Sequence, residues 1–191
     1  MFIVEGIVNS EYRKDNSLFL PYLIPKIDIE KTLIELKKEH KKAVHFVRAS
    51  RIFNNNQLLE SSSDDGEPKG SSGVPVLNVM RGNDLVECGI IVVRYFGGKL
   101  LGVGGLVRSY TNATLNVIKT AKENMMLVKY ESKSNVEFIL DFNQTNYAKY
   151  IANKLKINVL SISFDNCKTR INLEANLNKL EAFKKELENF K

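Results

Sequence analysis

The chain holds only two cysteines among its 191 residues, and this scarcity excludes several classes of protein. Cys88 and Cys167 stand far apart, each in an apolar, strand-like segment, and no Cys-x-x-Cys spacing occurs. Isolated cysteines of this kind indicate reduced core residues, not a disulfide framework or a cysteine metal site. No apolar run approaches the ~18–20 residues that would span a bilayer, and residues 1–5 lack the pattern of a signal peptide. We therefore expect a cytoplasmic protein without membrane contact.

The motifs of common nucleotide-binding and hydrolytic enzymes are also missing. No Gly-Lys-Ser/Thr is present, and residues 102–107 lack the third spaced glycine of a dinucleotide fingerprint. His45 alternates with Ala43 and Val47 on a predicted strand, which is typical of a packed core or edge histidine and not of a base. No Ser/His/Asp or Cys/His spacing supports nucleophilic catalysis. A P-loop NTPase and a Rossmann enzyme are disfavoured, and nothing in the sequence demands an enzyme or a cofactor.

Acidic residues are absent from Cys88 to Lys122, although the whole chain is only moderately basic at +6. That stretch carries five positive charges, on Arg94, Lys99, Arg108, Lys119 and Lys122. The last three fall within about one face of a predicted helix. Such a bias suits a polyanion, but it is also common in soluble proteins that bind none.

Five of the chain's eleven glycines lie between Gly97 and Gly105, after a predicted buried strand and before that helix. Short glycine loops allow positive φ and close approach, and a helix N-terminus can receive an anion. We expect an anion near the N–H groups of Gly104 and Gly105, which are predicted to hold backbone angles that a β-carbon disfavours. The alternative is a tight strand-to-helix connection with close packing and no ligand.

Two arginines and an acidic turn complete the candidate site. Arg94 and Arg108 bracket the glycine loop and can converge on a phosphate, which suits the planar guanidinium fork. Alternatively, one of them pairs with Asp64, Asp65 or Glu67. These three carboxylates could themselves hold Mg²⁺, but an acidic turn before a proline is more often a solvated loop or a helix cap. We predict no metal.

The hydrophobic pattern predicts an α+β chain in two domains. Strands are expected at 2–8, 18–24, 43–49 and 88–93, and turns at 54–56 and 165–166. Asp28 can cap a helix that runs toward His40, Ser61 to Gly73 reads as a polar loop, and Pro75 suits the first turn of a helix at 76–80. Beyond a linker near 121–134, the order strand, helix, strand, strand, helix is most of a split βαβ ferredoxin-like unit without its last strand. We predict domains at 1–123 and 130–191.

Four sequence blocks together resemble the YigZ/IMPACT family, in the right order over about fifty residues. They are Ser63-Asp64-Asp65-Gly66-Glu67-Pro68, the pair Gly73 and Pro75, Val92-Val93-Arg94-Tyr95-Phe96-Gly97-Gly98, and Leu101-Gly102-x-Gly104-Gly105-Leu106-Val107-Arg108-x-Tyr110. His45 with Ala49 fits a weaker upstream pattern. The chain departs from the family at Leu18, Val47 and Ser71-Ser72.

The resemblance implies an N-terminal domain like the second domain of a small-subunit ribosomal protein. It also implies a C-terminal domain of the ferredoxin-like kind found in elongation factor G. Proteins of this family have been linked to regulation of translation, RNA or ribosome binding is proposed for bacterial members, and no established catalytic activity comes with them. The extra N-terminal module of eukaryotic members is not expected here, so their partner does not carry over.

The sequence therefore predicts a non-catalytic protein that binds RNA or the ribosome and modulates translation. Its predicted binding residues are Arg94, Tyr95, Lys99, Gly104, Gly105, Arg108, Lys119 and Lys122, beside a motif loop of Asp64, Asp65, Gly66 and Glu67. The rival prediction is a phosphate- or nucleotide-handling enzyme that uses Asp64, Asp65 and Glu67 with a metal, and Arg94 and Arg108 on phosphate. A third possibility is a protein-interaction module that uses an exposed Tyr95-Phe96 pair.

Overall fold

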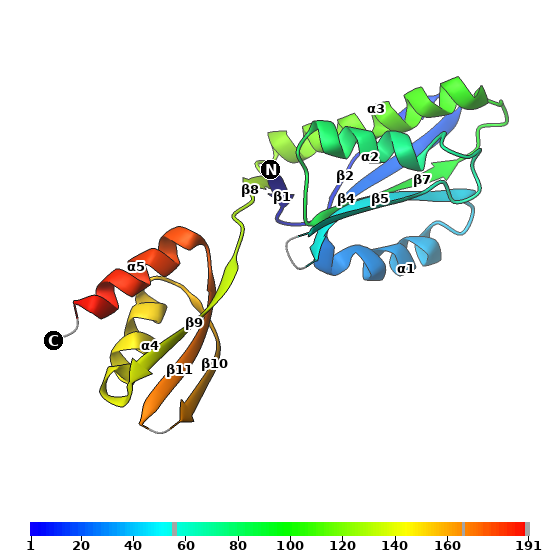
Figure 1. Cartoon of the computed structure of the whole chain (residues 1–191). Helices are drawn as coiled ribbons and strands as arrows, with labels where there is room; N and C mark the ends of the chain where they lie inside the picture. The colour runs from blue at the N-terminus through cyan, green and yellow to red at the C-terminus, as the bar shows by residue number, and fades with distance from the viewer. Residues whose placement is uncertain (55–56, 166, 190–191) are drawn as a thin grey trace. The chain divides into compact units, whose positions relative to one another are not determined.

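The computed structural model describes residues 1–54, 57–165 and 167–189 (Figure 1). The chain divides into two compact units, Met1–Tyr130 and Glu131–Lys191. The first unit runs past the predicted boundary at Glu123, because strand β8 (Leu127–Lys129) pairs with β1 (Phe2–Val4). Each unit has hydrophobic clusters of its own.

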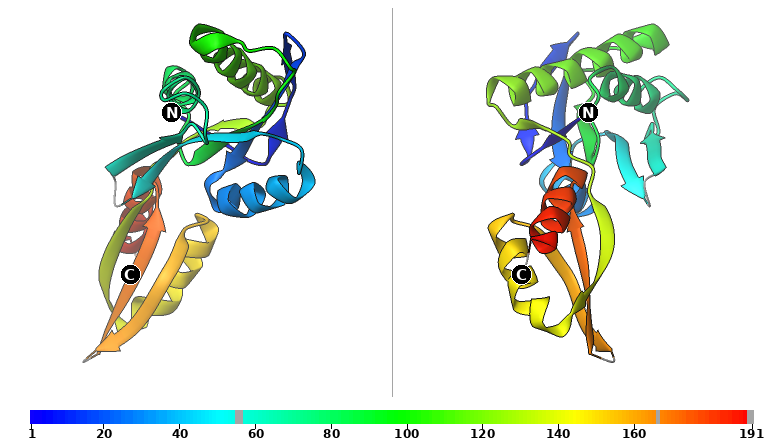
Figure 2. Two further views of the ribbon diagram at one scale, coloured as in Figure 1. Left: turned by 90° about the vertical axis from the view of Figure 1, so that its right-hand side faces the viewer. Right: turned by 60° about the vertical axis from the view of Figure 1, so that its left-hand side comes forward.

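The first unit is built on an antiparallel sheet with the strand order β2-β4-β7-β5-β6, and β3 also pairs with β4. Helices α2 and α3 cover one face of this sheet and α1 covers the other (Figures 1 and 2). The elements are β2 (Val8–Asn9), β3 (Tyr12–Lys14), β4 (Ser17–Pro25), α1 (Ile29–Glu39), β5 (His45–Asn54), β6 (Gln57–Ser63), α2 (Gly73–Gly82), β7 (Cys88–Tyr95) and α3 (Gly102–Glu123).

Helices on both faces explain the nearly continuous apolar run of β7. Ile90 and Val92 join the cluster beneath α2 and α3, whereas Ile91 and Val93 join the cluster beneath α1. Successive side chains of a strand point to opposite faces, so a strand covered on both sides must be apolar throughout. Because of the same alternation, Arg94 lies on the α2–α3 face.

Several element boundaries differ from the prediction. The strand predicted at 2–8 is two strands, β1 and β2, with different partners. The polar loop predicted from Ser61 begins only after Ser63, because β6 continues to pair with β5 up to that residue. Asp28 makes no side-chain capping bond, and α1 is instead entered through a 3₁₀ turn at Lys26–Asp28. The turns predicted at 54–56 and 165–166 include residues outside the described ranges.

The second unit follows the predicted order, with β9 (Ser134–Asp141), α4 (Thr145–Lys154), β10 (Asn158–Asp165), β11 (Lys168–Ala175) and α5 (Leu177–Glu188). Its antiparallel sheet has the order β10-β11-β9, and both helices lie on one face (Figure 1). Ile151, Ile171 and Phe183 are among the buried side chains of its core. Among the described residues no strand flanks the outer edge of β9, as expected for a ferredoxin-like unit without its last strand.

Candidate functional site

Three neighbouring strands place a row of side chains on the α2–α3 face of the sheet. Arg94 of β7 lies directly opposite Phe19 of β4 on one side and opposite His45 of β5 on the other. The guanidinium of Arg94 lies over the Phe19 ring, 5.5 Å from its centroid. Arg94 is only 5% exposed, so its charge needs a buried partner.

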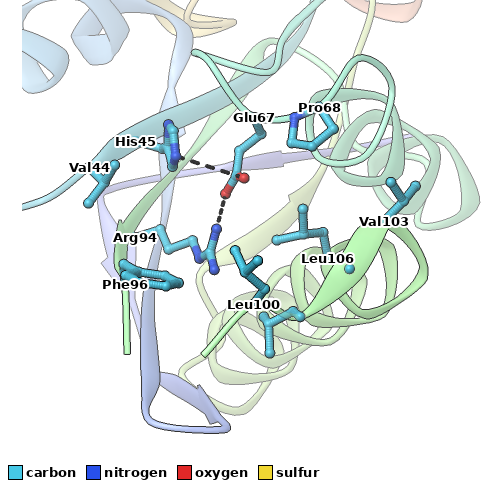
Figure 3. A pocket seen from close by; sticks show the side chains of 11 residues that line it. Val44, His45, Glu67, Pro68, Arg94, Phe96, Leu100, Val103 and Leu106 are labelled. Carbon is cyan, nitrogen blue, oxygen red and sulfur yellow. Dashed lines mark hydrogen bonds and ion pairs between the residues drawn. The ribbon is translucent and has the colours of Figure 1, made fainter. Parts of the chain in front are cut away.

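Glu67 is that partner (Figure 3). Its Oε1 accepts hydrogen bonds from Arg94 Nη1 at 2.6 Å and from the Tyr110 hydroxyl at 2.8 Å. The Glu67 side chain is 4% exposed. The ion pair with Arg94 and the hydrogen bond from Tyr110 offset the cost of removing its charge from water. Burial, and after it the charge of Glu67, raise the pKa of Tyr110 far above its usual range. Tyr110 therefore acts as a donor to Glu67.

The acidic residues before Glu67 accept hydrogen bonds that hold their loop in place. Asp64 accepts four hydrogen bonds, from the backbone N–H groups of Gly70, Ser72 and Gly73 and from the Ser72 hydroxyl, at the start of α2. Asp65 Oδ2 accepts the backbone N–H of Phe46 on β5 at 2.7 Å. Together these bonds fix the loop against β5 and α2, and so fix the position of Glu67.

Asp65 also determines which nitrogen of His45 carries a proton. His45 Nδ1 lies 2.7 Å from the backbone carbonyl oxygen of Asp65, which can only accept. When the ring is neutral, its proton is therefore on Nδ1 and its lone pair is on Nε2. That Nε2 faces Glu67 Oε2 at 3.8 Å (Figure 3).

These polar groups line a pocket of about 350 Å³. Its polar lining, called the floor here, consists of His45, Glu67 and Arg94, and the rest of its lining is apolar. The apolar residues are Val44, Pro68, Phe96, Leu100, Leu101, Val103 and Leu106. Leu100 is 85% exposed and Phe96 46% exposed, so a large apolar area surrounds the mouth. The arrangement can hold a flat, uncharged group whose edge makes hydrogen bonds.

The glycine loop differs from the prediction at its last two glycines. Positive φ values occur at Gly98 (80°) and Gly102 (67°). Gly104 and Gly105 lie inside α3 with ordinary helical angles, so the predicted unfavourable backbone there is wrong. Gly97 is required for another reason, because a β-carbon there would lie 2.2 Å from the Asn16 carbonyl carbon. The loop is therefore close-packed at Gly97 and left-handed at Gly98 and Gly102.

Two of the predicted binding residues point inward. Arg94 is buried in its ion pair with Glu67, so it does not reach out with Arg108 to a shared phosphate. This is the pairing that the sequence left open as the alternative. Tyr95 lies on the opposite face of the sheet, where its hydroxyl is 2.8 Å from His40 Nδ1. Tyr95 and Phe96 therefore do not form one exposed pair.

The remaining predicted cations are exposed. Arg108, Lys119 and Lys122 lie on α3, and Lys99 lies in the loop before it. Lys99 Nζ lies 4.0 Å from Asp15 Oδ1, and Lys119 Nζ lies 3.8 Å from Glu123 Oε1. Lys122 Nζ donates a hydrogen bond to Asn83 Oδ1. Exposed pairs of this kind are weak and exchange readily.

The carboxylates do not converge on a metal site. Asp64 and Asp65 are used by backbone N–H groups, and Oε1 of Glu67 is used by Arg94 and Tyr110. In the part of the chain that the structure describes, no group of three or more His, Cys, Asp or Glu side chains is arranged to hold a metal ion. Within the same ranges, no helix is both long and apolar enough to cross a membrane.

His45 is the residue whose position the sequence did not reveal. Its alternation on a strand indicated a packed histidine, and nothing marked it as a neighbour of Arg94. The contact arises from the pairing of β5 with β7, strands about forty residues apart in the chain. Only the register of that pairing could have identified it.

Comparisons with known proteins bear on this site. Residues 16–118 match the family model of the Impact N-terminal domain. This matched range contains His45, Glu67, Arg94 and Tyr110. A protein of Haemophilus influenzae described as an IMPACT family member is 32% identical over 154 residues, which span 80% of this chain and 72% of that protein. YigZ of Escherichia coli, also described as an IMPACT family member, is 38% identical over 86 residues, or 41% of this chain and 42% of that protein.

A solved structure agrees with the fold. A crystal structure described as a hypothetical protein superposes with a TM-score of 0.79 at 22% identity, and it covers 100% of this chain and 92% of its own. At that identity the likeness supports the α+β architecture alone. Because the family model matches more than half of this chain, the chain belongs to the IMPACT family.

Proposed function

We propose that this chain binds RNA or the ribosome and thereby modulates translation, without chemistry of its own. The observation that carries the proposal is the exposed basic face of α3, defined here as Arg108, Lys119 and Lys122, together with Lys99 in the preceding loop. No acidic residue occurs in the sequence from Cys88 to Lys122, and the exposed pairs of Lys99 with Asp15 and of Lys119 with Glu123 are weak. The link to translation comes from the family to which the chain belongs.

The spacing of the basic face supports contact with a nucleic-acid backbone. At 100° per residue, Arg108, Lys119 and Lys122 lie within about 60° around the helix axis and extend over about 21 Å along it. A row of cations on one stiff helix can neutralise successive phosphates, which gives affinity without sequence preference. Arg94 and Tyr95 are not part of this surface, because their side chains are used inside the protein.

Salt dependence tests the proposal. Four exposed cations should give single-stranded RNA a log–log salt slope of up to about −2.8, from roughly −0.7 per phosphate contact. Arg108→Ala should weaken binding to all sequences alike and flatten the slope by about 0.7. Lys38→Ala is the matched control, because Lys38 is an exposed cation on α1 across the sheet. Equal affinities and slopes for wild type and Arg108→Ala would contradict the proposal.

The alternative from the sequence, a phosphate- or nucleotide-handling enzyme, has one observation in its favour. His45 Nε2 is a potential base beside Glu67 and Arg94, an arrangement that the sequence did not reveal. The metal part of that alternative finds no support, since Asp64 and Asp65 serve the backbone. Turnover of a nucleotide by wild type that is lost in His45→Gln would favour the enzyme. No hydrolysis and no calorimetric uptake of Mg²⁺ or Mn²⁺ would leave binding as the function.

A further inference from the structure

We infer that the pocket lined by His45, Glu67 and Phe96 binds an unpaired guanine base, so that RNA held on the basic face of α3 is read at one nucleotide. This inference rests on the proposed function and adds a specificity that a row of phosphate contacts does not provide. The pocket and the basic face share one helix, since Val103 and Leu106 line the pocket and Arg108 follows two residues later.

The polar atoms of the pocket floor include two hydrogen-bond acceptors that lack a donor within the described ranges of the chain. Glu67 Oε1 already accepts two hydrogen bonds, and among the described residues Oε2 receives none. When the His45 ring is neutral, the Asp65 carbonyl holds its proton on Nδ1, so that Nε2 presents a lone pair. These two acceptors lie 3.8 Å apart, and with no proton between them they cannot bond each other. A ligand that fits must therefore bring donors to both.

The charge of the floor favours a neutral ligand. The carboxylate of Glu67 is balanced by the guanidinium of Arg94 at 2.6 Å. An ammonium ligand would add positive charge beside Arg94, and a phosphate would meet the acceptor side of the Glu67 carboxylate and the His45 lone pair. A neutral group with adjacent N–H donors avoids both costs.

Among the standard bases, guanine alone has two adjacent donors, N1–H and the N2 amino group, on its Watson–Crick edge. Adenine and cytosine place a ring acceptor toward the carboxylate, and uracil offers one N–H between two carbonyl acceptors. Proteins read unpaired bases along this edge while the ring stacks on a flat side chain. The pocket volume of about 350 Å³ is large enough for a purine base.

Phe96 provides the flat side chain. Its ring is 46% exposed at the rim, and the guanidinium of Arg94 lies 5.8 Å from its centroid. Arg94 therefore supports Phe96 while it neutralises Glu67. Figure 3 shows His45 and Arg94 directed at the Glu67 carboxylate, with Phe96 and Leu100 beside them. Stacking on an exposed aromatic ring contributes to the binding of single strands and depends little on salt.

The experiment measures fluorescence anisotropy with labelled oligouridine probes of about eight nucleotides, a length within the range of single-strand sites. Each probe carries one central guanosine, inosine or adenosine. Wild type should bind the guanosine probe about tenfold more tightly than the adenosine probe, with inosine between them because it lacks the N2 amino donor. Glu67→Gln should abolish this preference.

Glu67→Gln could unfold the protein, because it removes the partner of Arg94. Phe96→Ala is therefore the second variant, since Phe96 is half exposed and makes no hydrogen bond with its side chain. It should weaken binding of the guanosine probe at least about fivefold and leave the salt slope unchanged. Arg108→Ala should instead weaken all three probes equally and preserve their ratio.

Free nucleotides distinguish a pocket that binds a mononucleotide from one that binds a base within RNA. Guanosine monophosphate that binds about tenfold better than adenosine monophosphate, with no binding of any RNA probe, would support the pocket and overturn the proposed function. RNA probes that bind with the expected salt slope but equal affinity for guanosine and adenosine would overturn the pocket and leave the proposed function standing. No binding of either kind would overturn both.

Discussion

Asp64 illustrates how one side chain can hold an entire loop. Burial raises the pKa of Asp64, but the hydrogen bonds from Gly70, Ser72 and Gly73 together lower it by more, so the pKa lies below its usual range. The carboxylate caps α2 from a position outside the helix and thereby sets the path of the chain to Glu67. A residue that looked like a metal ligand in the sequence is therefore a structural cap.

Removal of this cap should be costly. Asp64→Ala should lower the free energy of unfolding by about 2 kcal/mol, the upper end for a lost helix cap, because several N–H groups lose their acceptor together. Asp28→Ala is the control, since Asp28 precedes α1 but makes no capping bond with its side chain. It should change stability by less than about 0.5 kcal/mol. Urea denaturation measures both, and equal effects would show that Asp64 is not the cap.

Glu60 gives the chain an acid-sensitive ion pair. Its Oε1 accepts Arg51 Nε at 2.8 Å and Arg81 Nε at 3.1 Å, and hydrogen bonding to Arg81 is the largest of the causes that lower the pKa of Glu60 to about 2. Since the folded pKa lies below the unfolded value of roughly 4.3, the pair stabilises the fold fully above that value. This stabilisation is lost as the pH falls toward 2.

Glu60→Gln should therefore flatten the acid dependence of stability, because an amide does not titrate. The urea midpoints of wild type and variant should differ most at neutral pH and converge between about pH 4.5 and pH 2. Glu5→Gln, a change at an exposed carboxylate, should leave the wild-type profile unaltered. A constant gap between Glu60→Gln and wild type at every pH would contradict the ionic explanation.

At the scale of elements, the start of α3 is where the sequence pattern was most open to misreading. Five glycines suggested one flexible cradle, but the structure places Gly97 in close contact with Asn16 and divides the other four between two environments. Gly98 and Gly102 adopt positive φ before and at the helix start, whereas Gly104 and Gly105 are ordinary helical residues. Conformational freedom is therefore required at the entry to α3 and not within it.

A pair of alanine substitutions distinguishes these environments. Gly104→Ala should stabilise the protein by about 0.5–1 kcal/mol, because alanine favours a helix and its β-carbon would meet only the Arg108 guanidinium, at 3.6 Å. Gly102→Ala should destabilise it by about 1 kcal/mol or more, because its φ of 67° strains any L side chain. Thermal melts of the two variants should shift in opposite directions, and shifts of the same sign would refute this assignment.

At the scale of the whole molecule, the chain has separate cores in its two units. Met80 is fully buried in the first unit, and Phe183 is fully buried in the second. The second unit, Glu131–Lys191, is short, and small domains bury a smaller share of their surface and are marginally stable. Multidomain chains of this kind commonly unfold in more than one step.

Core substitutions should therefore act on one unit at a time. Phe183→Ala should cost about 3–5 kcal/mol and Met80→Ala about 2–5 kcal/mol. In a calorimetric scan, Phe183→Ala should lower the transition of the second unit only, and Met80→Ala that of the first unit only. If each substitution shifted a single common transition, the two units would not be independent.

The sequence determined most of the architecture, because the period of its hydrophobic residues reflects local backbone geometry. The continuous apolar run at 88–93 predicted a strand buried on both faces, and the order of elements after residue 134 predicted the ferredoxin-like unit; both are confirmed. The four motif blocks identified the family. Errors fell where local signals are ambiguous, as at Gly6, which separates two strands predicted as one, and at Asp28, whose residue type suits a cap that its side chain does not form.

Only the tertiary structure decided how the chemistry is grouped. His45, Glu67, Arg94 and Tyr110 come from two strands, a loop and a helix, and they meet because β5 pairs with β7 in one register and α3 packs across that face. A shift of one residue in that register would turn His45 to the opposite face. Because β7 is apolar on both of its faces, the sequence pattern of that strand does not show which residue of β5 lies opposite Arg94. Burial then decides the role of Arg94, because a guanidinium withdrawn from water must pair with Glu67 before it can serve a ligand.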